Sequence, residues 1–217
     1  MATFETYEAK GMKESFSDLI FNISPTETPF LSMIGTTTSK QRLHQWQKDE
    51  LSDPDANAVA EGAATATATL APTTVASNYT QISTKVFGVS GTLEVTEKYG
   101  RDSSMAYQTA KASRSLKTDV DFTMTGTVQV SAVAATTVAR TAAAVPSWLL
   151  TNYNGTGTAP AGGDGTTAPV NGVVRAFTQS MLDDVIKSAW ENGGKPSVIL
   201  AGGTQKTAIS GFDGVTG

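Results

Sequence analysis

The sequence contains no cysteine and a single histidine, His44. The absence of cysteine excludes thiolate catalysis, disulfide bonds and metal or iron–sulfur sites built on Cys ligands. One histidine cannot form a multi-histidine metal site, and any Ser-His-Asp triad would have to use it. Because His44 lies in a polar, alternating segment, we interpret it as an exposed strand residue.

Charge is also scarce. Charged residues make up 17% of the 217 residues, the net charge is −4 and the sequence pI is about 5.0. A nucleic-acid-binding protein would gather Lys and Arg on one face, whereas the 16 basic residues here are scattered. The densest group of bases is accompanied by acids: Arg101, Lys111, Arg114 and Lys117, with Asp102, Asp119 and Asp121. The sequence therefore gives no support to a DNA-binding surface.

Long apolar runs and export signals are missing as well. The first five residues carry neither a basic nor an apolar signal region. No apolar run approaches the roughly 20 residues that cross a bilayer. We expect a protein made and used in the cytoplasm, without a membrane partner.

Two local patterns imitate ligand sites and fail on chemistry. Residues 202–207 resemble a phosphate-binding loop, but Gln205 stands directly before Lys206, where glycine is needed. Residues 53–58 begin like a calcium loop, but Ala58 replaces the required glycine. We therefore predict no catalytic residue, no cofactor, no metal site and no enzymatic activity.

Residues 1–40 are interpreted as an arm. Four apolar residues recur at the spacing of one helical face: Phe16, Leu19, Ile20 and Ile23. Pro25 ends this segment, because the residue before a proline is displaced from the α region. A second apolar patch covers residues 28–35 and ends at glycine. Two short apolar patches cannot form a core alone, so we expect them to pack against another segment.

Residues 41–92 are expected to form two long strands joined by an extended loop. Residues 41–51 alternate roughly between polar and apolar, with Leu43 and Trp46 apolar. Residues 78–89 are rich in the β-branched and aromatic residues that strands favour. The intervening Pro-, Asp-, Ala- and Thr-rich stretch has few large apolar residues, so we predict that it projects from the body.

Residues 96–126 are the longest helical candidate. Thr96 can cap the start, or alternatively Asp102 or Ser103, and Gly126 stands where a helix ends. Small and medium residues form one stripe at helical spacing: Met105, Thr109, Ala112, Leu116 and Val120. We interpret this stripe as the face that lies against a sheet or an arm.

The remainder is interpreted as a mixed helix-and-strand region. Residues 154–165 are rich in Gly and predict a surface loop. Residues 178–192 form the clearest amphipathic helix, with Thr178 as N-cap and Trp190 on the apolar face. Residues 197–201 predict a short buried strand and residues 204–210 a short helix. That strand needs a partner and none follows, so we expect the region to be incomplete.

Several blocks, in this order, resemble the major capsid proteins of tailed bacteriophages. Residues 16–30 are similar to the N-terminal arm signature of that family. Residues 78–82, 106–112 and 209–212 are similar to further blocks. The resemblance implies an α+β chain with the Hong Kong 97-like capsid fold. It implies an N-terminal arm over 1–40, an E-loop β-hairpin over 41–95, the spine helix of a peripheral domain over 96–127, and an axial domain over 128–217.

Under this resemblance, three groups of residues are expected to make contacts. The arm contacts are Phe16, Ile20, Phe30 and Ile34. The E-loop contacts are Trp46, Tyr79 and Ile82. The packing residues of the spine helix are Met105, Ala112, Leu116 and Val120.

The leading functional hypothesis is a structural subunit of a phage head. Copies would self-assemble into hexamers and pentamers of an icosahedral or prolate shell that matures from a procapsid and encloses double-stranded DNA. The protein would reside in the virion after assembly in the host bacterial cytoplasm. Its partners would be other copies and portal, scaffold or decoration proteins, and packaged DNA would be contacted only non-specifically. The alternative is a Thr-rich surface-binding or adhesin-like module without catalytic activity.

Overall fold

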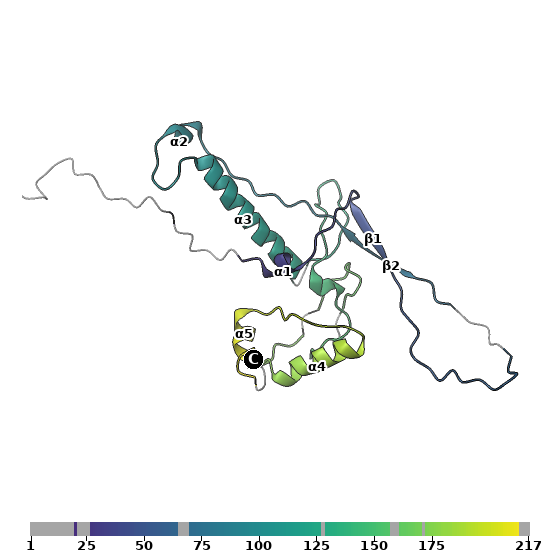
Figure 1. Cartoon of the computed structure of the whole chain (residues 1–217). Coiled ribbons are helices and arrows are strands. Elements are labelled where there is room, and N and C mark those ends of the chain that lie inside the picture. Colours follow the sequence, from purple (N-terminus) through teal and green to yellow (C-terminus); the bar gives the residue numbers. More distant parts are fainter. Residues whose placement is uncertain are drawn as a thin grey trace, which may run out of the picture. The chain divides into compact units, whose positions relative to one another are not determined.

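The computed structural model describes residues 20, 27–64, 70–126, 129–156, 161–170 and 172–212. Within these residues it contains five α-helices, one 3-10 helix and one two-stranded antiparallel sheet (Figure 1). The chain is therefore mixed helix and sheet, which confirms the α+β class.

The chain divides into two compact units, each built from segments that are far apart in the sequence. One unit joins residues 1–28 to 83–119, and the other joins residues 29–82 to 120–217. Helix α3 (Ser104–Thr125) begins in the first unit and ends in the second.

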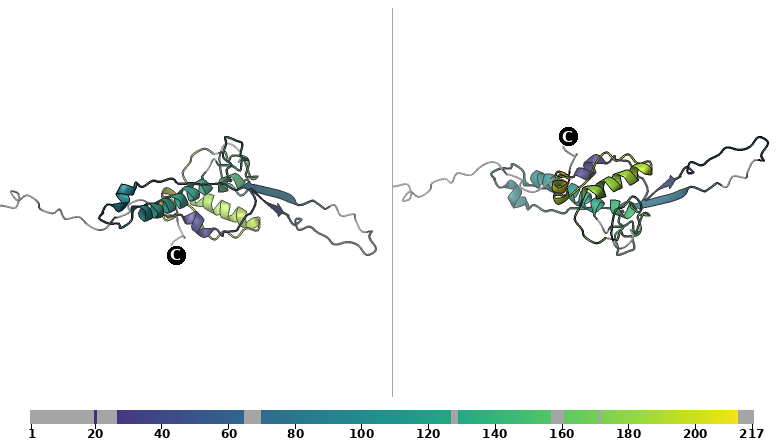
Figure 2. Two further views of the ribbon diagram at one scale, coloured as in Figure 1. Left: turned by 90° about the horizontal axis from the view of Figure 1, so that it is seen from above. Right: turned by 90° about the horizontal axis from the view of Figure 1, so that it is seen from below.

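The sheet consists of β1 (Leu43–Lys48) and β2 (Thr74–Tyr79), with Leu43 opposite Tyr79 and Lys48 opposite Thr74. Residues 49–64 lead away from these strands in each view (Figures 1 and 2). The strand predicted over 78–89 is wrong in extent, because β2 ends at Tyr79. One further ladder bond, from the Thr80 N–H to the Arg42 carbonyl, closes the sheet at 2.9 Å.

The first unit contains α2 (Gly91–Val95) and the start of α3. A helix start at Thr96 is wrong, because Thr96 is the C-cap of α2 and its hydroxyl donates to the Thr92 carbonyl. The alternative start is confirmed: α3 begins at Ser104, and the Ser103 hydroxyl accepts the Ala106 N–H at 3.1 Å. Gly126 follows the last residue of the helix, as predicted.

The second unit contains the remaining helices: α1 (Pro29–Met33), the 3-10 helix η1 (Val145–Trp148), α4 (Gln179–Glu191) and α5 (Gly203–Ile209). The predicted helices near 178–192 and 204–210 are therefore confirmed. Thr178 is the N-cap residue of α4, although its side chain makes no capping bond.

The strand predicted at 197–201 is wrong. These residues have no regular structure, and Val198, Ile199 and Leu200 are 50–62% exposed. A strand requires a hydrogen-bonded neighbour, and the sheet of the described residues contains only β1 and β2.

Burial is slight in the described part of the chain. Its buried apolar residues are Ala76 and Ala144, and its buried polar ones are Ser104, Ser131 and Ser147. All five are small, whereas Leu, Ile, Val, Phe and Trp normally supply most of a core. Large apolar side chains are therefore left at the surface.

Candidate assembly surface

Hydrogen bonds fix the base of the β-hairpin to residues 129–148. The Tyr79 N–H donates to the hydroxyl of buried Ser131 at 3.0 Å. The Arg140 guanidinium donates to the Thr80 carbonyl at 2.6 Å. The Ala143 N–H donates to the Asn78 side-chain oxygen at 2.9 Å. Three bonds from separate residues hold one end of the hairpin in a single register.

A side-chain network and an aromatic pair extend this anchor. The Gln81 side-chain oxygen accepts from the Gln129 amide and, at 3.2 Å, from the Ala142 N–H. The Trp46 ring on β1 lies 5.3 Å from the Trp148 ring on η1, centroid to centroid. These contacts also explain why β2 stops at Tyr79, since Gln81 bonds outside the sheet.

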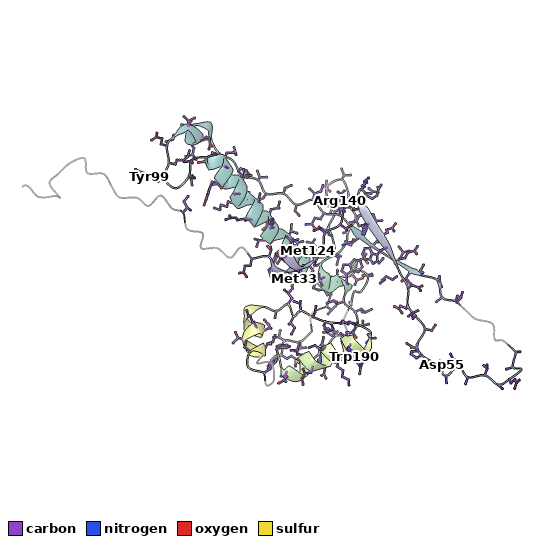
Figure 3. All side chains as sticks on the ribbon, viewed as in Figure 1. Met33, Asp55, Tyr99, Met124, Arg140 and Trp190 are labelled. Carbon is purple, nitrogen blue, oxygen red and sulfur yellow. The ribbon has the colours of Figure 1, made fainter. Side chains whose placement is uncertain are left out.

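The part of the hairpin beyond the strands lacks such anchors. Leu51 is 98% exposed, Val59 is 83% exposed and Leu70 is 88% exposed. The side-chain hydrogen bonds of this stretch are local, as from the Ala56 N–H to the Asp55 carboxylate at 2.7 Å. Asp55 lies on this loop, away from the strands (Figure 3). Fixed at its base, the loop presents apolar side chains with no cover from its own chain among the described residues.

The arm residues fall in different settings. Phe16 lies outside the described residues, and Ile20 is 41% exposed. Phe30 and Ile34 are both half-buried at α1, where the Ile34 N–H donates to the Phe30 carbonyl. The Asp121 carboxylate of α3 accepts the Leu31 N–H at 2.7 Å and so fixes α1 to the end of that helix.

The other expected contact residues are largely accessible. In the hairpin, Trp46 is 37% exposed, Tyr79 is half-buried and Ile82 is 73% exposed, beyond the end of β2. Along α3, Met105 is 46% exposed, while Ala112, Leu116 and Val120 are half-buried. The buried residue of this helix is Ser104. Thus neither the three expected contact residues of the hairpin nor the four of α3 form a buried cluster in the structure.

Several exposed apolar residues were not anticipated from the sequence. Trp190 was placed on the apolar face of its helix, yet it is 71% exposed (Figure 3). With Ile186 and Pro196 it lines an open depression that also includes Asp183, Lys187 and Lys195. Phe122 on α3 is 76% exposed. Helical periodicity identifies an apolar face, but it does not show whether the same chain covers that face.

Two carboxylates have lowered pKa values and serve structural roles. A hydrogen bond from the Ser103 hydroxyl at 2.6 Å lowers the pKa of Glu94, aided by the N–H groups of Met105 and Ser104 and by the charge of Lys98. Glu94 therefore ties α2 to the start of α3. The hydroxyl and N–H groups of Thr166 and Thr167 similarly lower the pKa of Asp164 in a tight turn.

The charge balance expected near α3 is wrong in detail. Asp119 pairs with the Lys85 ammonium at 2.7 Å, and Asp121 accepts the Leu31 N–H. Lys111, Arg114 and Lys117 are exposed, and the ion pairs among the described residues do not include them. These bases therefore form no ion pair with a described acid, and Asp121, four residues from Lys117, offsets only part of their charge.

The described residues contain neither a group of side chains suited to a metal ion nor a helix long and apolar enough to cross a membrane. The described surface offers many exposed apolar and charged side chains. A small polar hollow also lies beside α4, where Asn152, Asn154, Asp184 and Ser188 are joined by hydrogen bonds. A surface with so many exposed apolar side chains suits protein–protein contact.

Comparison with known proteins agrees with this type of surface. The family model described as SU10 major capsid protein matches residues 2–217. A major capsid protein of Escherichia phage Phieco32 is 39% identical over 119 residues, which is 54% of this chain and 34% of that relative. The match thus spans about a third of the relative's length.

The class of protein indicated is a structural phage protein. The chain belongs to the SU10 major capsid protein family. This membership supports a structural role in a capsid and favours it over the adhesin-like alternative.

Proposed function

We propose that the chain is a shell subunit with the Hong Kong 97-like fold. Copies assemble in the host cytoplasm into hexamers and pentamers of an icosahedral or prolate phage head, which encloses double-stranded DNA. In this proposal residues 1–40 are the N-terminal arm, 41–95 the E-loop, 96–127 the spine helix region and 128–217 part of the axial domain. Portal, scaffold or decoration proteins are further partners.

One observation carries this proposal: the described chain buries two small apolar residues and leaves many large ones exposed. A lone soluble protein rarely exposes a large contiguous apolar patch. Repeated contacts between copies would cover these side chains, and weak contacts repeated over many copies give a stable shell.

Family membership supplies the second support, because a major capsid protein is by its name the main component of a capsid. The anchored hairpin base supplies the third. Hydrogen bonds of Ser131, Arg140 and Asn78 fix one end of the hairpin. The other end, the projecting loop, is thereby positioned to contact a neighbouring copy.

The test is expression of the full-length protein, followed by electron microscopy and sedimentation over a range of concentrations. We expect closed shells with a concentration threshold. A stable, soluble monomer at all concentrations, with the hairpin folded, would overturn the proposal. A matched variant, Leu51→Asp in the loop, should lower the shell yield, whereas Ser52→Asp next to it should lower it less.

A further inference from the structure

The first half of the hairpin loop, residues 49–61, is acidic. Between Asp49 and Thr84 the sequence has five acidic residues and no Lys or Arg. The acids are Asp49, Glu50, Asp53, Asp55 and Glu61. All five are exposed, and none takes part in the ion pairs of the described residues. A chain with net charge −4 thus places a net −5 on one projecting loop.

The complementary feature is the row of bases on α3, hereafter the basic ridge: Lys111, Arg114 and Lys117. Residues three apart are neighbours on a helix surface, and the three positions span about 9 Å along the axis. Like charges at this spacing repel mildly. Among the described residues no carboxylate forms an ion pair with the ridge: Asp119 pairs with Lys85, and Asp121 accepts the Leu31 N–H. Asp121 keeps its negative charge four residues from Lys117, so the ridge and Asp121 together carry a net charge of +2.

We propose that the acidic loop of one copy docks on the basic ridge of a second copy. This inference rests on the proposed shell function and names the charged contact within it. Pro54 holds the preceding Asp53 in extended backbone, and alternate residues of an extended chain point to the same side. Asp53 and Asp55 would therefore present two carboxylates about 7 Å apart, a spacing that the ridge can match.

The apolar residues of the loop fit the same contact. Leu51 and Val59 flank the acids and are nearly fully exposed. Charge complementarity would orient the loop and speed its association, and the apolar side chains would then be covered. A loop of one charge sign also resists docking on another acidic loop, which limits wrong pairings.

The experiment uses charge reversal in the full-length protein, read out as shell yield by sedimentation and electron microscopy. The loop variant is Asp53→Lys with Asp55→Lys, and the ridge variant is Lys111→Glu with Arg114→Glu. Each alone should lower the yield about tenfold or more, since like charges would face each other. Both variants in one chain should restore most of the yield. The matched control for charge is Lys40→Glu with Lys206→Glu, at two exposed positions outside the ridge, which should lower the yield much less.

A mixture of the two variant chains separates contacts between copies from contacts within one chain. If the loop of one copy binds the ridge of another, an equal mixture gives a clearly higher yield of shells than either variant alone. A contact within one chain would give no rescue in the mixture and would overturn the inference. Normal shells from both single variants would also overturn it.

A ridge that binds DNA gives a third pattern. Its variant would form normal shells with less packaged DNA, and the loop variant would not compensate; that result overturns the inference. In all these cases the wild-type protein still forms shells. Failure of the wild type to form shells would instead overturn the proposed function itself.

Discussion

Replacing Ser131 by Ala should loosen the base of the hairpin. The Ser131 hydroxyl accepts the Tyr79 N–H at 3.0 Å, and Ser131 is 7% exposed. Alanine removes the acceptor without adding bulk, so the Tyr79 N–H loses its partner. A buried donor left without a partner costs about 1–3 kcal/mol. Tyr79 is only half-buried, so water can partly replace the bond, and we expect the lower part of that range.

The assay is hydrogen exchange of the Tyr79 amide in the free subunit, combined with urea unfolding. A loss of about 1.4 kcal/mol corresponds to a tenfold faster exchange if local opening governs the rate. The backbone bond from Ser131 N–H to the Gly165 carbonyl, 2.7 Å long, is retained in the variant. The change should therefore be confined to the hairpin base.

The matched control is Ser52→Ala, which removes a hydroxyl from the exposed loop and should change stability by less than about 0.5 kcal/mol. If Ser131→Ala were equally neutral and left the exchange of Tyr79 unchanged, the hydrogen bond would not anchor the hairpin.

Residues 52–64 should exchange almost without protection in the free subunit and become protected in shells, as mass spectrometry can measure. Phe30→Asp should lower shell yield strongly, because a half-buried site would receive an unpaired charge; sedimentation can measure this. Glu94→Gln should flatten the pH dependence of thermal unfolding on the acid side. Because the pKa of Glu94 is lowered in the folded state, its ionised carboxylate stabilises the fold at pH values above the ordinary carboxyl pKa. This contribution is lost as the pH falls through the folded-state pKa.

Controls make these three outcomes decisive. If residues 52–64 were equally protected from exchange in the free subunit and in shells, then contacts with neighbouring copies would not be what orders this loop. Thr38→Asp, at an exposed position near α1, should be tolerated; if it lowers the yield as much as Phe30→Asp, the site is not specific. If the pH dependence of thermal unfolding on the acid side were unchanged in Glu94→Gln, the bonds from Glu94 to Ser103 and Ser104 would contribute little to stability.

Local patterns predicted the helices better than the strands. α4 and α5 were predictable because their termini carry local signals, such as Thr178 and the glycines at 193–194 and 202–203. The start of α3 had competing caps, and the bonds to Glu94 favour Ser103. The strands predicted over 78–89 and 197–201 failed in whole or in part, because a strand exists only with a partner and composition does not reveal one.

The sequence predicted which residues belong to the candidate surface better than it predicted their contacts and exposure. The sequence identified Trp46 and Tyr79 as hairpin residues, and the structure places both at the anchored end. It did not identify Ser131, Gln129 or Arg140 as the anchor, because polar side chains in irregular segments carry no periodic signal. Periodicity placed Trp190 on the apolar face of its helix, but whether that face is covered depends on which segments of the chain lie beside α4.

The pairing of charged residues on α3 also depends on the spatial arrangement of the chain, and it affects the proposed contact between copies. In the sequence, Asp119 and Asp121 accompany the bases of α3, but in the structure they bond to Lys85 and to the Leu31 N–H. These two acids therefore fix local structure and form no ion pair with the basic ridge. Replacing Lys85 by Met would remove the cation that pairs with Asp119. Asp119 and Lys117 do not face each other on the helix, but the Asp119 charge would still lie within a Debye length, roughly 10 Å, of the ridge. The positive potential of the ridge should therefore fall, and with it the affinity for an acidic loop, which the shell yield by sedimentation would measure.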